Sequence, residues 1–238
     1  MSACLCEKPD RNKKFCAIAI DGPSGAGKSS LAKGLAEKLG FLYLDTGALY
    51  RAVGLHVLES GTGGGEKEKI EAMIDGGDIE IDVVYENGEQ KLFLNDRDVS
   101  GQIRENIISK YASDVSKIPK VREFLLETQR NAAEKNNIVM DGRDIGTVIL
   151  PGADVKIFLT AAPEERAKRR YEELVQKGQA VEYGAILREI TERDEQDSAR
   201  AAAPLRPAGD AVELDNSDCA SPADALEKAL KIIKGKLL

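Results

Sequence analysis

The sequence has 238 residues, a formal net charge of -7 and 42% hydrophobic residues. This length allows a full-sized core with one or two subdomains, and the composition is that of an ordered globular protein. The acidic charge argues against duplex nucleic acid as the partner, because such binding requires a clustered basic face. No run approaches the roughly 20 apolar residues of a membrane span, so we expect no membrane partner.

The cysteines and the N-terminal residues bear on the cellular compartment of the protein. Cys4, Cys6 and Cys16 lie near the start of the sequence, and Cys219 lies far from them. This spacing fits neither a disulfide framework nor a paired zinc motif, so we expect a cytoplasmic protein. Residues 1–14 lack the apolar core of a signal peptide, and we expect them to form a disordered leader.

The first candidate site lies between a predicted strand and a predicted helix. Residues 15–20 form a continuous apolar run, as in a buried parallel strand. The next residues match G-x-x-x-x-G-K-[ST], in which backbone N–H groups and a helix N-terminus bind phosphate. In this motif Lys28 reaches the outer phosphates of a nucleotide, and Ser29 holds Mg²⁺. The predicted nucleotide-binding residues of this loop are Gly22, Pro23, Ser24, Gly25, Ala26, Gly27, Lys28, Ser29 and Ser30.

A second strand end follows the first predicted helix, which covers residues 29–39. The strand, over 41–44, leads into a helix over 48–60 that carries Tyr50 and Arg51 near its start. One interpretation is a surface arginine beside a half-buried tyrosine. The other is a second phosphate site, because strand ends of α/β sheets bind ligands and arginine binds phosphate in a bidentate manner.

Residues 62–135 interrupt the alternation of strands and helices. Alternating segments at 79–83 and 91–94 flank Asn87-Gly88 and predict a β-hairpin. Helical patterns then return at 102–117 and 120–135. We therefore expect an inserted α+β subdomain in this region.

Acidic residues follow a third apolar strand, predicted over 137–140. The sequence there is D-G-R-D-I-G-T, in which Asp141 stands where P-loop proteins place a carboxylate that orients the Mg²⁺ hydration shell. Arg143 adds a bidentate donor for phosphate. The alternative interpretation is a solvated turn with an internal ion pair.

Two helices with charged faces follow a buried strand at 155–160. Their charged side chains recur at helical spacing and therefore lie on one face of each helix. Either these are solvated faces with ordinary ion pairs, or they form a lid, about 168–192, whose cations close over nucleotide phosphates. The side chains are Arg166, Arg169 and Arg170 on the first helix, and Arg193, Asp197 and Arg200 on the second, over 182–200.

A last strand at 211–214 and an amphipathic helix at 224–237 complete the pattern. Because five apolar strands alternate with helices, the expected fold class is α/β, a five-stranded parallel sheet with helices on both faces. This P-loop core comprises residues 15–61 and 136–238.

Taken together, these motifs resemble those of the bacterial cytidylate kinases, which are P-loop nucleoside monophosphate kinases. The resemblance runs from about Phe15 to the C-terminus. The segments that carry it are AIDGPSGAGKSS, LDTGALYR, DVSGQIR, DGRDIGT, VKIFLTA with EERAKRR, and TERDEQDSARAAAPL. The P-loop alone fits many families, whereas LDTGALYR, DGRDIGT and R-D-x-x-D-x-x-R are highly specific in combination. Thr46 and Ser29-Ser30 differ from the commonest family residues but keep a hydroxyl group.

The resemblance implies Mg²⁺-assisted phosphorylation of CMP and dCMP by ATP, and it implies roles for individual residues. The implied catalytic residues are Lys28, Asp141, Arg143 and Arg193, with Ser29 and Asp141 as metal ligands. Arg166 and Arg170 are the implied ATP-binding residues outside the P-loop. The implied substrate-binding residues are Arg51, Arg143 and Arg193 for the acceptor phosphate, Ser113, Arg122 and Asp144 for cytosine, Asp197 and Arg200 for the sugar and base, and also Thr46 and Tyr50.

Two alternatives to this function are a P-loop kinase of another small acceptor, such as UMP or another metabolite, and a non-enzymatic switch or nucleic-acid-stimulated ATPase. The insert at 62–135 and the pair of Asp144 and Arg122 favour a nucleobase acceptor. The absence of an N-K-x-D motif and the acidic charge disfavour the second alternative. We expect a monomer whose partners are nucleotides, with no nucleic acid and no membrane.

Overall fold

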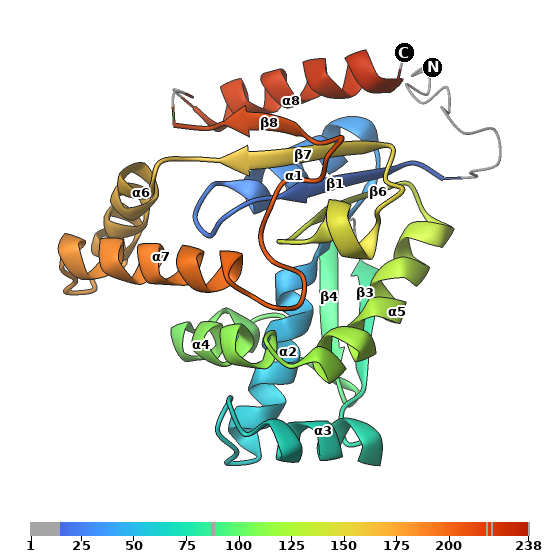
Figure 1. Ribbon diagram of the computed structural model, residues 1–238, viewed down its shortest axis with the longest axis vertical. Helices are drawn as coiled ribbons and strands as arrows, with labels where there is room; N and C mark the ends of the chain where they lie inside the picture. The colour runs from blue at the N-terminus through green and yellow to red at the C-terminus, as the bar shows by residue number, and fades with distance from the viewer. Residues whose placement is uncertain (1–14, 87–88, 218, 220, 238) are drawn as a thin grey trace. The chain divides into compact units, whose positions relative to one another are not determined.

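The computed structural model describes residues 15–86, 89–217, 219 and 221–237. The predicted leader at 1–14 and the predicted Asn87-Gly88 turn lie outside the described residues. The chain divides into two compact units, the first formed by Met1–Leu42 with Asn136–Leu238 and the second by Tyr43–Lys135 (Figure 1). Within the described part, every helix is too short or too polar to cross a membrane.

The larger sheet is parallel and has five strands, of which β1, β6, β7 and β8 lie wholly in the first unit. Its strands lie in the order β2-β6-β1-β7-β8 (Figure 1). In the central strand β1, Ala19 lies opposite Met140 of β6 and Lys156 of β7. The strands are β1 (Ala17–Asp21), β2 (Leu42–Asp45), β6 (Ile138–Asp141), β7 (Val155–Thr160) and β8 (Val212–Asp215).

The order of the sheet places the candidate phosphate loop at a specific point. β1 lies between β6 and β7, so the loop that follows β1 and the turn that follows β6 leave from the same edge of the sheet. Ligands of open α/β sheets bind at this carboxyl edge. The residues of β1 and β6 are buried throughout, as expected of central parallel strands.

The helices of the first unit pack in two groups. α1 and α8 contact each other and the strands of the sheet, whereas α6 and α7 lie side by side (Figure 1). Ala167, Leu174, Ile186 and Ile190 form the small core between α6 and α7. The helices are α1 (Lys28–Leu39), the short π-helix η2 (Ile145–Ile149), α6 (Pro163–Gln176), α7 (Tyr183–Ser198) and α8 (Pro222–Leu237). The expected fold class is thus confirmed.

The second unit combines helices with a three-stranded antiparallel sheet in the order β3-β4-β5. Ile81 of β3 lies opposite Leu94 of β4, which confirms the predicted hairpin. Its strands are β3 (Ile81–Glu86), β4 (Glu89–Leu94) and β5 (Arg97–Asp98). Its helices are α2 (Thr46–Glu59), α3 (Lys67–Gly76), the 3-10 turn η1 (Gln102–Arg104), α4 (Asn106–Val115) and α5 (Pro119–Lys135).

Two features of the second unit differ from the prediction. The single helical pattern at 102–117 is wrong, because Glu105 has extended backbone (φ -64°, ψ 145°) and separates η1 from α4. α3 was not predicted, because its preceding glycines suggested a loop, yet Ile70 anchors the helix in the core. The compact unit comprises Tyr43–Lys135, in which α2 shares a core with α4 and α5.

Candidate active site

The loop after β1 takes its shape from its backbone. Gly22 has φ +147°, and a Cβ atom there would lie 2.0 Å from the carbonyl oxygen of Leu159. Gly27 has φ +96° and immediately precedes α1. Both positions therefore require glycine, and the loop leads into the N-terminus of α1, where backbone N–H groups favour an anion.

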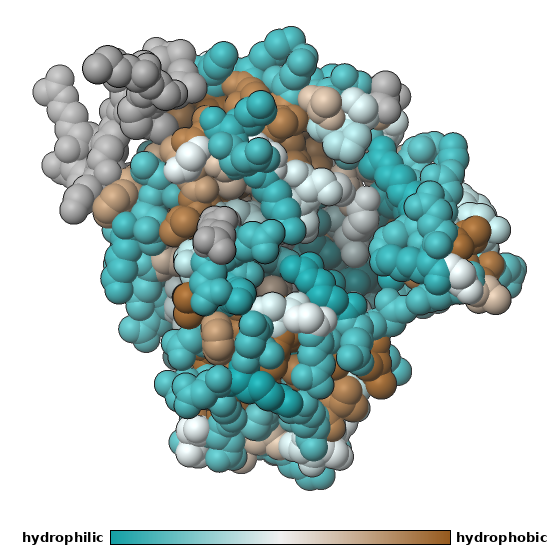
Figure 2. Space-filling view, turned by 180° about the vertical axis from the view of Figure 1, so that it is seen from behind, coloured by the Kyte–Doolittle hydropathy of each residue, from teal (hydrophilic) through white to brown (hydrophobic). Residues whose placement is uncertain are grey.

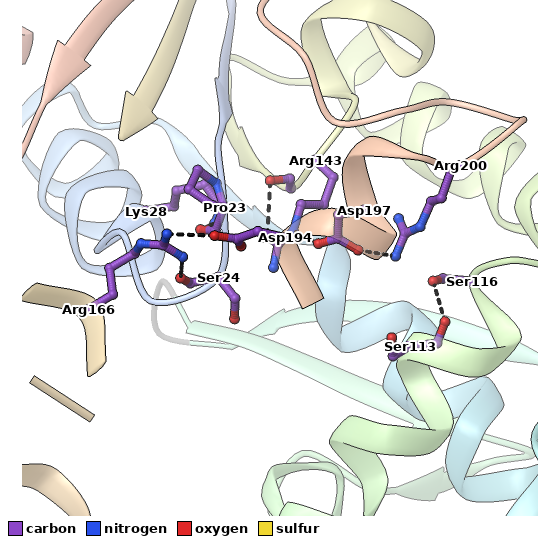
Figure 3. Close-up of polar contacts among 11 residues, drawn as sticks. Pro23, Ser24, Lys28, Ser113, Ser116, Arg143, Arg166, Asp194, Asp197 and Arg200 are labelled. Atoms are coloured by element: carbon purple, nitrogen blue, oxygen red, sulfur yellow. Dashed lines mark hydrogen bonds and ion pairs between the residues drawn. The ribbon is translucent and has the colours of Figure 1, made fainter. Parts of the chain in front are cut away.

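Two side chains from distant parts of the sequence hold carbonyl groups of this loop. Arg166 Nη1 donates to Ser24 O at 3.0 Å, and Asn216 Nδ2 donates to Ala26 O at 2.8 Å. Arg166 is buried, and its Nη2 donates to Asp194 Oδ2 at 2.5 Å (Figure 3). The loop is therefore anchored by α6, by α7 through Arg166, and by the segment after β8.

Lys28 is the buried cation of the loop. Its Nζ donates to Pro23 O at 2.6 Å, so the side chain folds back over the loop (Figure 3). Burial and the nearby Arg143 guanidinium lower the pKa of Lys28 well below its ordinary value, although Asp141 and Asp21 act in the opposite direction. A phosphate anion beside Lys28 would favour its charged form, so the site suits a polyanionic ligand.

Ser29 and Asp141, the two predicted metal ligands, meet at the carboxyl edge of the sheet. Ser29 Oγ donates to Asp141 Oδ2 at 2.9 Å, across 112 positions of the sequence. A hydroxyl and a carboxylate are hard oxygen ligands, which Mg²⁺ combines with water and phosphate oxygens in kinases. The two side chains therefore fit a magnesium ion that is completed by a nucleotide.

Asp21, the last residue of β1, is a site residue that the prediction missed. Its Oδ1 accepts from Ile145 N and its Oδ2 accepts from Gly146 N, both at 2.7 Å. Burial raises the pKa of Asp21 to about 6, even though these two hydrogen bonds lower it. Asp21 ends a buried strand just as Asp141 does. The criterion that identified Asp141, an acidic residue at the end of an apolar strand, would therefore also have identified Asp21.

Asp197 on α7 joins two of the predicted arginines. Arg143 Nε donates to Asp197 Oδ2 at 2.9 Å, and Arg200 Nη2 donates to Asp197 Oδ1 (Figure 3). Asp197 is 1% exposed, and burial alone would raise its pKa, but Arg143 and Arg200 lower it below its ordinary value. Two guanidinium groups around one carboxylate leave a cluster with a net positive charge, which suits an anionic ligand such as a phosphate group.

Arg193 belongs to the same region of the first unit. Its charge lowers the pKa of Asp197 and also that of Lys28. The positive side chains predicted from separate motifs therefore influence one another electrostatically. Asp144 is buried in the turn between β6 and η2, next to Arg143 in the sequence.

The second unit holds the other predicted acceptor-binding residues. The Arg122 guanidinium carbon lies 5.7 Å from the centre of the Tyr50 ring, and Arg122 Nη1 donates to Ser116 O at 3.3 Å. Ser116 Oγ in turn donates to Ser113 O at 2.8 Å (Figure 3). Tyr50, Arg122 and Ser113 thus lie in one cluster. The remaining predicted residues of this unit lie on α2: Thr46 and Arg51.

Three side chains near the site, those of Arg170, Asp194 and Asn216, have partners that the sequence patterns did not predict. Arg170 forms an exposed ion pair with Glu173 on its own helix, at 2.8 Å, so its contact with ATP stays a prediction. Asp194 and Asn216 were not predicted as site residues: Asp194 lies within the R-D-x-x-D-x-x-R segment but received no role there, and Asn216 lies outside the quoted segments. Their partners lie 28 and 190 positions away, at Arg166 and Ala26, and only the tertiary structure shows these contacts.

Comparison with known proteins gives matches along most of the chain. The family model described as cytidylate kinase matches residues 18–235. The cytidylate kinase of Caldicellulosiruptor saccharolyticus is 50% identical over 215 residues, which cover 90% of this chain and 94% of that protein. The cytidylate kinase of Bacillus subtilis is 45% identical over 224 residues, which cover 94% and 99%. A solved shikimate kinase from Bacteroides thetaiotaomicron is more distant, at 15% identity and a TM-score of 0.46, with 92% of this chain and 98% of that chain covered. The family match over nearly the whole sequence shows that this chain belongs to the cytidylate kinase family.

Proposed function

We propose that this chain transfers the γ-phosphoryl group of ATP to CMP or dCMP, giving ADP and CDP or dCDP. The observation that carries the proposal is the placement of Lys28 in the P-loop of the same unit as the positive cluster around Asp197. Its family relationship to cytidylate kinases supports cytidine nucleotides as acceptors. In the reaction, an acceptor phosphate oxygen forms a bond to the γ-phosphorus, and the bond from the γ-phosphorus to the ADP oxygen breaks.

The acceptor oxygen is already anionic, so the reaction needs no strong general base. Catalysis then depends on alignment of the two phosphates and on stabilisation of the charge that spreads over the transferred group. Lys28 contacts the outer phosphates of ATP, and the acceptor phosphate binds Arg51, Arg143 and Arg193. These cations offset the repulsion between two anionic substrates.

Cytosine recognition requires groups that complement its hydrogen-bonding edge. Cytosine presents an N4 donor beside the N3 and O2 acceptors, so a carboxylate can accept from N4 while an arginine or hydroxyl donates. Asp144, Arg122 and Ser113 provide these groups. Uracil has an acceptor at position 4, which Asp144 would meet unfavourably.

The remaining assignments concern the metal, the sugar and the lid. Ser29 and Asp141 hold Mg²⁺, which supplies charge neutralisation at the phosphates when it is bound. Asp197 and Arg200 contact the sugar and base of the acceptor. The helices α6 and α7 act as a lid, about 168–192, that excludes water from the transferred group.

We also propose that the protein is a cytoplasmic monomer. Among the described residues, the exposed large hydrophobic side chains lie on five different elements: Val84, Ile107, Val148, Val175 and Tyr183. Figure 2 shows one face on which hydrophilic residues predominate, with hydrophobic residues in small groups between them. Scattered apolar side chains are typical of a surface that is not a subunit interface. Sedimentation equilibrium should therefore give a mass near 25.8 kDa.

The decisive experiment is a coupled assay of ADP release with CMP, dCMP, UMP and AMP as acceptors. We expect the highest kcat/KM with CMP or dCMP. A higher value with UMP or AMP would contradict the proposed specificity. ATP turnover that required RNA or DNA and ignored CMP would contradict the proposed reaction.

A further inference from the structure

We propose that Asp21 is a positioning residue that fixes the turn 141–147, which carries the acceptor-binding residues, to the end of β1. This inference rests on the proposed function, because that function assigns Arg143 and Asp144 in this turn to the acceptor nucleotide. Asp21 itself contacts neither substrate in this account. It acts through the backbone of the turn.

The contact uses both oxygens of the Asp21 carboxylate. They accept from the consecutive backbone groups Ile145 N and Gly146 N, each at 2.7 Å, across more than 120 positions of the sequence. Asp21 is 4% exposed, so water cannot easily replace it as the acceptor. Two short hydrogen bonds that a buried carboxylate accepts fix the orientation of the two peptide groups that immediately follow Asp144.

Asp21 caps the N-terminus of η2, a role that the side chain of Asp144 does not take. Asp144 is the N-cap residue of η2, but its side chain does not cap that helix. Its backbone oxygen accepts from Val148 N at 2.9 Å, while the first N–H groups of η2 are bound by Asp21. An aspartate at an N-cap commonly satisfies these groups itself. Because Asp21 does so here, the Asp144 carboxylate is not required for capping.

Gly146 packs closely against the side chains of Asp21 and Lys156. A Cβ atom at position 146 would lie 3.3 Å from Asp21 Oδ2 and 3.0 Å from Lys156 Cδ. Such a side chain would press against the carboxylate that holds the turn. Gly146 therefore allows the backbone to approach Asp21 closely enough to donate to it.

The P-loop has its own supports, so the effects of Asp21 on the two substrates should differ. Arg166 and Asn216 hold the carbonyl groups of Ser24 and Ala26 without Asp21. The turn 141–147 is bound by Asp21 directly. Loss of the Asp21 carboxylate should therefore weaken acceptor binding more than ATP binding.

The test is the variant Asp21→Asn, which keeps the shape of the side chain but replaces one acceptor oxygen with an NH₂ donor. Asp154→Asn is a matched control, because Asp154 Oδ2 accepts from Ala17 N at 2.8 Å at the opposite end of β1. We expect Asp21→Asn to raise the KM for CMP about tenfold and to reduce the preference for CMP over UMP, while the KM for ATP changes by less than about threefold. Asp154→Asn should lower thermal stability and leave both KM values unchanged. An equal rise in both KM values for Asp21→Asn, or no rise in either, would overturn the proposal.

Backbone hydrogen exchange tests the contact even if the variant does not fold. In the wild-type protein without nucleotides, the amides of Ile145 and Gly146 should exchange slowly, with protection like that of β1. Exchange as fast as in an exposed loop would overturn the proposal. If the wild-type protein phosphorylates neither CMP nor dCMP, the proposed function fails on that result alone, and the exchange measurement still judges the contact separately.

Discussion

The P-loop and the positive cluster around Asp197 are built by different means, although both lie in the first unit. The P-loop depends on backbone conformation, because a Cβ atom at Gly22 would lie only 2.0 Å from the carbonyl oxygen of Leu159. The cluster depends on side chains from separate segments, because Asp197 on α7 binds Arg143, which follows β6, and Arg200, which lies two positions beyond the end of α7. One short contiguous motif is therefore sufficient to predict the first site, whereas the second combines two separate segments, DGRDIGT and R-D-x-x-D-x-x-R, whose contacts only the tertiary structure shows.

The largest effect should follow from Lys28→Met, which removes the buried cation of the P-loop. We expect kcat to fall about 10³-fold, because the charge on the transferred group loses its closest fixed cation. The fold should be retained, because the new side chain fits a buried position. Single-turnover kinetics measures the loss, and a decrease smaller than about tenfold would show that the backbone of the loop is sufficient without this side chain.

Asp197→Asn should give the next largest effect, and it tests the cluster of side chains. Removal of one carboxylate leaves Arg143 and Arg200 close together without the charge between them. We expect kcat/KM for CMP to fall about 100-fold, together with reduced thermal stability, because breaking a buried ion pair is strongly destabilising. Unchanged kinetics with CMP would mean that the cluster does not serve the acceptor.

Asp194→Asn tests whether the P-loop also depends on a distant side chain. Arg166 would keep its bond to Ser24 O but lose its ionic partner on α7. We expect about a tenfold rise in the KM for ATP and little change in the KM for CMP. Glu195→Gln, an exposed neighbour on the same helix, is the control and should change neither KM. A rise in the KM for CMP alone would contradict this assignment.

The raised pKa of Asp21 predicts a dependence of stability on pH. Its pKa is about 6 in the folded protein and 3.8 in the reference state, so the folded protein binds the proton more tightly. The stabilisation is therefore full below about pH 4 and is lost as the pH rises through 6. The unfolding free energy of the wild type, relative to Asp21→Asn, should decrease by about 1 kcal/mol between about pH 5 and pH 7. Urea unfolding at several pH values measures this difference, and a constant difference would contradict the raised pKa.

The smallest effect should follow from Arg170→Ala on α6. Arg170 pairs with Glu173 at the surface, and such pairs contribute less than about 1 kcal/mol to stability. Thermal stability should therefore hardly change, while the KM for ATP rises about threefold if Arg170 contacts the donor phosphates. Lys168→Ala on the same helix is the control. Equal KM values for the two variants would remove Arg170 from the predicted ATP-binding residues.

Much of the fold could be predicted because its signals are local. Apolar strands, the glycine-rich loop and the helix that follows it appear as contiguous patterns, and the structure places β7 at Val155–Thr160 as predicted. α3 escaped detection because its core contact, Ile70, follows a run of glycines. The break at Glu105 also left no mark in the sequence, because no proline or glycine occupies that position.

The site residues divide in the same way. Ser29 and Asp141 were predicted, because Ser29 ends the G-x-x-x-x-G-K-[ST] motif and Asp141 ends a buried strand, and the two side chains are in contact. Asp194 and Asn216 were not, because their roles depend on partners that are distant in the sequence. Asp21 was within reach of prediction, since it ends a buried strand directly before the P-loop. Local motifs thus indicate the candidate site residues, whereas the side chains that support those residues are found through long-range contacts.

The most direct test of this account is the ratio of kcat/KM for CMP to that for UMP, measured in the wild-type protein and in Asp144→Ala. The account predicts a strong preference for CMP in the wild type and its loss in the variant, with the KM for ATP changed by less than about threefold, because the P-loop is anchored independently of Asp144. A variant that keeps the wild-type preference for CMP would contradict the assignment of Asp144 to the base.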